Sequence, residues 1–349
     1  MLQIKLVRHG LLTLAAAAVV ALLVLQSEDV SNFEYIQVAA YVCAAAGLTL
    51  LIGVNGQLSL GHAALMAVGA YSAALYLRSG SEDSLASAGD LFVALLVGSV
   101  TAAVVGIAVG AVAARLRGPY LAGATLALGA CVVGVTTYFD HLLGGDQGLT
   151  MPLTEVPAPL SAALTSYQWS ALVSLGTALL VLFLLTNLKY SPVGREMAAV
   201  RDHEVAAQLC GLSVARVQIN TFVVSSAAAG AGGAILGVLY LQIASPGAFT
   251  LFLSIYLLAA VVIGGLGSMR GAVIGTVIVL YFGRLIEDRV AHLGLSTAQT
   301  DRLAAHLPLA AFGVLLIVVM LAVPGGIQGT LGRIAPRLLQ LMETVGGKK

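Results

Sequence analysis

Long apolar stretches dominate this sequence and set the first limit on how it can fold. Only 9% of its 349 residues are charged, against about 25% in a typical soluble domain. Ten stretches approach or exceed the length of about 20 residues that crosses a bilayer as a helix. They are rich in Leu, Ala, Val and Gly without alternation, which favours helices over a membrane barrel. The expected spans are residues 11–26, 36–53, 59–77, 91–114, 119–139, 168–188, 218–243, 251–267, 271–284 and 307–323.

We therefore expect an all-α polytopic membrane protein with about ten transmembrane helices, forming one transmembrane domain over residues 1–349. If all ten spans cross and the N-terminus is cytoplasmic, 13 of the 17 Lys and Arg residues lie inside and 12 of the 16 acids lie outside. This distribution follows the positive-inside rule. It predicts cytoplasmic N- and C-termini, with the basic tail 324–349 inside. Segment 11–26 could be a cleaved signal peptide, but no small-residue cleavage site precedes Ser27 closely, so we favour a retained helix.

The segment 189–216 is the longest charged interruption between the spans. It contains four basic and three acidic residues, so it belongs in water beside the membrane and, by the charge distribution, on the cytoplasmic side. Pro192 near the start, good helix formers from Arg195 to Leu209 and Gly211 as a stop predict a short helix. This segment is either a solvated connection between two spans or a surface to which another protein binds.

Two glycine-rich stretches interrupt the apolar pattern and predict broken helices near residues 53–61 and 264–271. Around the first break, Asn55, Gln57, Ser59 and His62 are polar in an apolar setting. Irregular backbone at membrane depth survives only where protein or a water-filled path satisfies its polar groups, and broken helices often line transport sites. These four residues therefore either border a translocation path or merely cap the broken ends.

Several of these motifs together resemble the LivM-type permease subunits of ABC importers for branched-chain amino acids. In order and spacing they cover most of residues 36–330. The motifs are GLTLLIGVNGQLSLGHAALMAVGAY (47–71), RLRGPYLAGATLALG (115–129), GGDQGL (144–149), GREMAAVRDHEVAAQLCGLSVARVQ (194–218), IASPGAF (243–249) and GGLGSMRGAVIG (264–275).

The resemblance implies that the segment 189–216 is a coupling helix that docks in a groove of an ATP-hydrolysing subunit. Val205, Ala206 and Ala207, followed by Gly211, are similar to the core of the EAA motif of importers. The acid, Glu204, stands one place early, and the proline that ends the longer motif elsewhere is missing. The coupling residues implied are Arg195, Glu204, Ala206, Ala207 and Gly211.

The partners implied by the resemblance are a sister permease in a heterodimer, two ATP-binding subunits and an extracytoplasmic substrate-binding protein, all at the inner membrane. The chain has no G-x-x-x-x-G-K-[ST] loop, so we expect ATP and Mg²⁺ on the partner subunits. We expect this chain to bind no cofactor, metal or nucleic acid and to have no enzymatic activity of its own.

Three alternatives compete with a permease for branched-chain or other hydrophobic amino acids. A urea or short-amide permease would share the same motifs. An ion-coupled secondary transporter usually has charged groups inside the membrane, and the expected spans have none in their interiors. An intramembrane enzyme would need a nucleophile and a base, for which Ser59 and His62 are spaced three apart.

Overall fold

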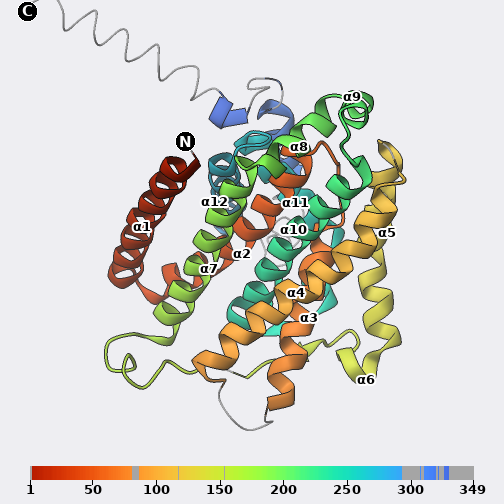
Figure 1. The fold of residues 1–349 in the computed structure, drawn as a ribbon. Helices are drawn as coiled ribbons and strands as arrows, with labels where there is room; N and C mark the ends of the chain where they lie inside the picture. The colour runs from red at the N-terminus through yellow and green to blue at the C-terminus, as the bar shows by residue number, and fades with distance from the viewer. Residues whose placement is uncertain are drawn as a thin grey trace, which may run out of the picture. The chain divides into compact units, whose positions relative to one another are not determined.

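The computed structural model describes residues 2–80, 86–116, 118–152, 154–292, 307, 310–319, 321 and 326–329. They divide into two compact units, Met1–Leu257 and Leu258–Lys349. The described residues are overwhelmingly helical (Figure 1), which confirms the all-α class. The helices of the first unit are α1 (Leu2–Gln26), α2 (Asp29–Leu48), α3 (His62–Gly80), α4 (Ala88–Ala113), α5 (Pro119–Tyr138), α6 (Asp140–Leu143), α7 (Ser166–Lys189), α8 (Pro192–Asp202), α9 (Glu204–Leu209) and α10 (Val214–Ala234). Helix α11 (Leu251–Gly264) contains the boundary, and α12 (Met269–Ala291) belongs to the second unit.

Among the described residues, eight helices are long and apolar enough to cross a membrane. The expected span 59–77 corresponds to α3, which begins at His62 and is not one of these eight. Of the expected span 307–323, the structure describes a shorter apolar helix, Ala310–Val319. Most of the expected tail 324–349 lies outside the described residues. The chain is thus a polytopic membrane protein.

Helix α10 forms the centre of the first unit, where it packs against α2, α3 and α4 (Figure 1). Three glycines allow this close packing. A Cβ atom at Gly230 would lie 2.4 Å from the Ala102 side chain and 2.5 Å from the carbonyl oxygen of Gly98, and one at Gly69 would lie 2.2 Å from the carbonyl oxygen of Gly230. Small residues let helix backbones approach one another in membranes. These small residues therefore form a tightly packed core.

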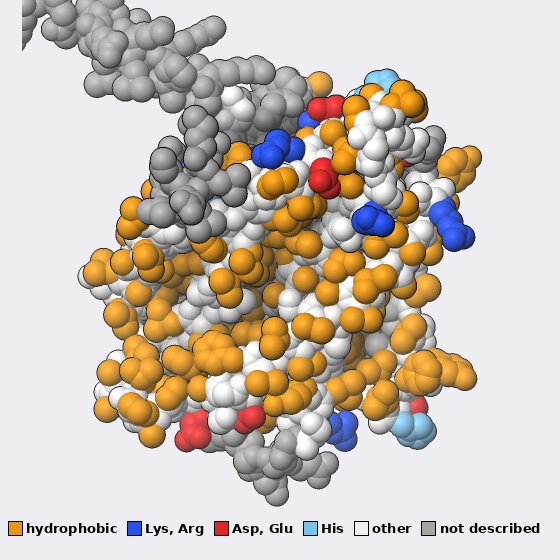
Figure 2. Space-filling view, viewed as in Figure 1, with side chains coloured by type: hydrophobic (Ala, Val, Ile, Leu, Met, Phe, Trp, Pro, Cys, Tyr) orange, Lys and Arg blue, Asp and Glu red, His pale blue; other side chains and the backbone are white. Residues whose placement is uncertain are grey.

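The surface separates apolar from charged side chains in the manner of a membrane protein. On the face shown in Figure 2, hydrophobic side chains form a broad band and charged side chains lie at its two ends. The charges at one end surround α8 and α9 (Figures 1 and 2). Large apolar side chains of α1, α4 and α5 are exposed on the outside of the first unit, as expected for contact with lipid.

Both predicted helix breaks are present. In the first unit, α2 continues into a π-helical segment, η1 (Thr49–Val54), and residues 55–61 are not helical before α3 begins at His62. In the second unit, α11 ends at Gly264 and α12 begins at Met269. Gly265 and Gly267 adopt positive φ in that turn. A Cβ atom at Gly275 would lie 1.9 Å from the Ala260 carbonyl oxygen, so α11 and α12 pack closely.

A short antiparallel ribbon joins two distant motifs. Strand β1 (Leu149–Thr150), at the end of the GGDQGL motif, pairs with β2 (Ile243–Ala244), at the start of IASPGAF. A second π-helical segment, η2 (Ile235–Leu241), leads from α10 into β2, and a 3₁₀ turn, η3 (Pro246–Ala248), follows it. The loop after α6 is therefore tied to the end of the central helix.

Candidate functional site

The segment between α7 and α10 folds as two helices, so the expected single helix from Arg195 to Leu209 is wrong. Helix α8 begins at Pro192, whose missing amide hydrogen is not needed at a helix start. His203 adopts an extended conformation (φ −157°, ψ 96°), which ends α8 at Asp202. The same residue starts α9, because its Nδ1 accepts a hydrogen bond from the amide of Ala206 at 3.2 Å. We call α8, His203 and α9 the connector.

Gly211 closes the C-terminal end of α9 in a Schellman motif. The amide of Leu212 donates to the carbonyl of Ala207, and the amide of Gly211 donates to the carbonyl of Gln208. Gly211 has φ +86°, a left-handed conformation that favours glycine. A Cβ atom there would meet no atom within 4 Å, so the preference for glycine comes from the backbone conformation.

The connector has a buried side and an exposed side. Met197 and Val200 of α8 and Ala207 of α9 are buried and fasten it to the first unit. On the exposed side, Leu209 is 85% exposed and Val205 is 60% exposed. These two apolar side chains are costly to leave in water.

The predicted coupling residues therefore separate into two groups. Arg195, Ala206 and Gly211 are exposed and Glu204 is half-buried, whereas Ala207 is buried against the first unit. Leu209 was not among the predicted residues, and Val205 was named only as part of the EAA-like core. The apolar character of both within a charged segment was a usable signal. The exposed face of α9 thus centres on Val205, Ala206 and Leu209.

The four polar residues of the first break are all buried. His62 lies between two serines: its Nε2 is 2.8 Å from Ser225 Oγ of α10, and its Nδ1 is 3.3 Å from Ser59 Oγ. Within the described part of the chain, neither amide atom of the Asn55 side chain has a hydrogen-bond partner, and Gln57 Oε1 also lacks one. An unpaired buried polar group costs about 1–3 kcal/mol.

Side chains that sequence reasoning missed hold the far end of this break. The amide of Leu60 donates to Thr125 Oγ1 of α5 at 2.9 Å, and the amide of Ala63 donates to Ser254 Oγ of α11 at 3.0 Å. Such single hydroxyls have no pattern in the sequence that distinguishes them from other serines and threonines in apolar helices. They fix residues 60–63 against neighbouring helices.

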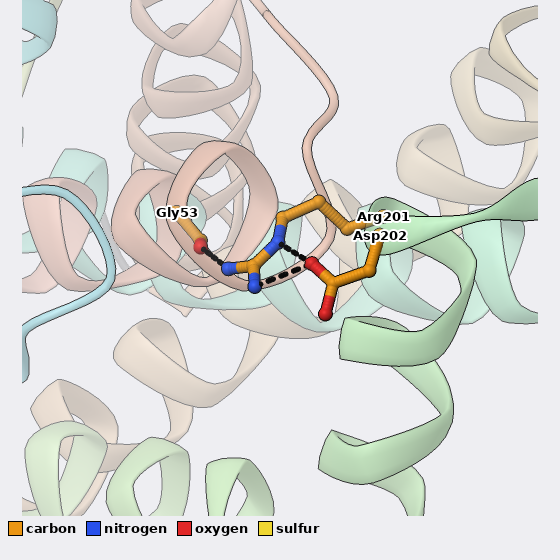
Figure 3. A network of polar contacts seen from close by, with 3 residues as sticks. All are labelled: Gly53, Arg201 and Asp202. Carbon is orange, nitrogen blue, oxygen red and sulfur yellow. Dashed lines mark hydrogen bonds and ion pairs between the residues drawn. The ribbon is translucent and has the colours of Figure 1, made fainter.

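One arginine joins the connector to the break. Arg201 of α8 donates from Nη1 to the carbonyl oxygen of Gly53 at 2.7 Å (Figure 3). Its Nε and Nη2 donate to Asp202 Oδ1 at 2.9 and 2.7 Å. The two stretches that the sequence singled out separately are therefore in direct contact.

The fold and this site define a class of protein: a multi-pass α-helical membrane protein whose broken helix is bonded to a connector between two spans. Comparison with known families identifies it further. Residues 34–324 match the family described as "Branched-chain amino acid transport system / permease component". The chain belongs to this family. No solved structure was found to match it.

Several curated relatives agree with this assignment. The high-affinity branched-chain amino acid transport system permease protein LivM of Salmonella typhimurium is 29% identical over 276 residues, which are 71% of this chain and 61% of the relative; LivM of Escherichia coli gives the same figures. The permease protein LivH of Escherichia coli is 26% identical over 302 residues, covering 83% of this chain and 92% of the relative. The match thus spans about three-fifths of the LivM relatives' length.

Proposed function

We propose that this chain is the permease subunit of an ATP-driven importer that carries branched-chain or other hydrophobic amino acids across the inner membrane. Its family is the permease component of a transport system. The relatives LivM and LivH are named for branched-chain amino acids, which supports that substrate over urea or short amides. In this proposal the membrane chain provides the path and separate subunits hydrolyse ATP.

The observation that carries the proposal is the exposed apolar face of the connector. Leu209 and Val205 project from a short helix that is fastened to the first unit on its other side by Met197, Val200 and Ala207. Apolar side chains in this position are suited to an apolar groove of a partner. We infer that α9 docks on an ATP-hydrolysing subunit, with Arg195, Glu204, Ala206 and Gly211 at or beside the contact.

The first break is the proposed border of the substrate path. Asn55, Gln57, Ser59 and His62 gather there, and the amide group of Asn55 is buried without a partner among the described residues. Helix ends and irregular backbone can bind the charged ends of an amino acid without buried ions. In the proposal, closure of the ATPase pair moves the connector and opens this break alternately to each side.

The complete transporter in this proposal contains a sister permease, two ATP-binding subunits with ATP and Mg²⁺, and an extracytoplasmic substrate-binding protein. This chain itself would bind no cofactor and catalyse no reaction. Its N- and C-termini would be cytoplasmic, because that orientation places most of the Lys and Arg residues inside.

The test is uptake of radiolabelled leucine into proteoliposomes that contain the transporter purified through a tag on this chain. We expect uptake to require ATP and binding protein and to resist ionophores. Leucine uptake by this chain alone, driven by an ion gradient, would contradict the importer mechanism. ATP-driven uptake of urea without leucine would contradict the substrate while leaving the class of transporter in place.

A further inference from the structure

A side chain from the connector caps the C-terminal end of the broken helix. The carbonyls of Leu50, Leu51 and Ile52 accept hydrogen bonds from the amides of Asn55, Gln57 and Gly56 at 3.0–3.1 Å. The carbonyl of Gly53 accepts instead from Arg201 Nη1 (Figure 3). The C-terminal end of a helix carries partial negative charge, so a guanidinium is the favourable group there.

The stem of Arg201 also covers the turn that follows. Gly56 has φ +77°, and a Cβ atom at this position would lie 2.7 Å from Cγ and 3.4 Å from Cβ of Arg201. One side chain therefore contacts both the Gly53 carbonyl, 148 positions away in the sequence, and the first turn of the break at Gly56. Asp202 accepts two hydrogen bonds from the same guanidinium.

Arg201 lies next to the junction of α8 and α9. It lies in the last turn of α8, three residues before Glu204, the first residue of α9. On the other side of the break, Leu60 is bonded to Thr125 of α5, and His62 is bonded to Ser225 of α10. The stretch 55–61 is thus held at one end by the connector and at the other by the surrounding helices.

We propose that Arg201 is a positioning residue that makes α8 and the end of the broken helix move as one piece, so that motion of α9 reaches the substrate path. The proposal rests on the proposed importer function and adds a specific transmitting residue to it. A cap with no part in transmission would affect stability alone. If Arg201 transmits the motion of α9, loss of its contact with Gly53 should leave ATP hydrolysis intact and reduce the uptake that hydrolysis drives.

The first experiment compares Arg201→Ala with Arg115→Ala in the assembled transporter. Arg115 is an exposed arginine just after α4, outside the connector, and serves as a charge-matched control. We expect Arg201→Ala to retain the ATPase subunits and basal ATP hydrolysis, while leucine uptake per ATP falls about tenfold, as for the loss of one charge-assisted hydrogen bond. Arg115→Ala should keep the wild-type ratio. An unchanged ratio in Arg201→Ala would overturn the proposal.

The second experiment replaces the contact by a covalent bond. The distance of 3.4 Å between a Cβ atom at position 56 and that of position 201 is close to the range of about 3.5–4.5 Å found in disulfides. In a background of Cys131→Ser and Cys210→Ser, the pair Gly56→Cys with Arg201→Cys should recover uptake per ATP on oxidation and lose it on reduction. The reduced protein carries the same strain at position 56, so it is its own control.

Two outcomes separate the failure of this inference from the failure of the proposed function. If the disulfide forms and uptake per ATP remains at the level of Arg201→Cys alone, α8 and the break do not move together, and the inference is wrong. If wild-type transporter in the same preparation shows no ATP-driven leucine uptake, the proposed function fails first.

Discussion

At the scale of single residues, the connector shows how exposure distinguishes neighbours that look alike in sequence. Ala206 and Ala207 stand side by side, yet Ala206 is exposed and Ala207 is buried. Ala207 therefore attaches α9 to its own chain, while Ala206 lies on the outer face with Val205 and Leu209. The residues available to a partner are thus set by helical phase and not by their place in a motif.

Leu209→Ser should weaken the proposed docking without harming the membrane domain. Burying a leucine side chain stabilises by about 1.5–3 kcal/mol, so we expect the affinity for the ATPase subunits to fall at least about tenfold. Leu142→Ser removes another exposed leucine, in α6, and is the matched control. Co-purification and binding titration measure the effect; equal retention by both variants would show that α9 is not the docking surface.

At the scale of secondary-structure elements, the caps decide where α9 begins and ends. With Gly211 at φ +86°, Gly211→Val should destabilise the end of α9 by about 1–2 kcal/mol, because a β-branched residue disfavours the left-handed region. Gly211→Asn should destabilise the end of α9 less, since asparagine tolerates the left-handed conformation. We expect uptake per ATP to fall in the order Gly, Asn, Val. If valine and asparagine behave alike, the cap does not matter for coupling.

Gly230→Val should disrupt the crossing of α10 with α3 and α4. The added atoms would overlap Ala102 and the Gly98 carbonyl, and overpacking typically costs about 1–3 kcal/mol. Gly176→Val in α7 is the control, because a Cβ atom there meets nothing within 4 Å. Thermal aggregation in detergent should begin at a lower temperature for Gly230→Val alone; matching curves would contradict the tight crossing.

The sequence predicted the elements better than the contacts between them. Apolar runs and glycines located the spans and both breaks, because each is a local property of about 20 residues or fewer. The extended conformation of His203 was missed, since helix propensity alone continued across it. The bond from Arg201 to Gly53 joins residues 148 positions apart, and no local pattern encodes such a pairing. The role of the four polar break residues as a path stays a prediction.

At the scale of the whole molecule, the relevant feature is the side of the membrane on which the connector lies. Charged side chains gather at both ends of the face in Figure 2, and α8 and α9 of the connector lie at one of these ends (Figures 1 and 2). The distribution of Lys and Arg predicts that the connector is cytoplasmic. The proposed coupling depends on that orientation, because ATP is available on that side.

Labelling of Cys210 tests the orientation directly, because this residue directly after α9 is exposed. In a background of Cys131→Ser, a membrane-impermeant maleimide should label Cys210 in inside-out vesicles and spare it in intact cells. Ser161→Cys combined with Cys210→Ser should give the opposite pattern, since residue 161 lies between the expected spans 119–139 and 168–188, on the side opposite the connector. Reaction of Cys210 from outside intact cells would place the connector on the wrong side for ATP-driven coupling.

The two caps of α9 have a further consequence for the kinetics of assembly. A helix of six residues is too short to be stable by itself in water, yet His203 and Gly211 hold it in shape before any other subunit arrives. Ordering a residue costs about 1–2 kcal/mol in backbone entropy. Because α9 is already ordered in the folded chain, binding does not have to include this cost. A prefolded helix can engage a rigid groove in a single encounter, without a slow folding step after contact.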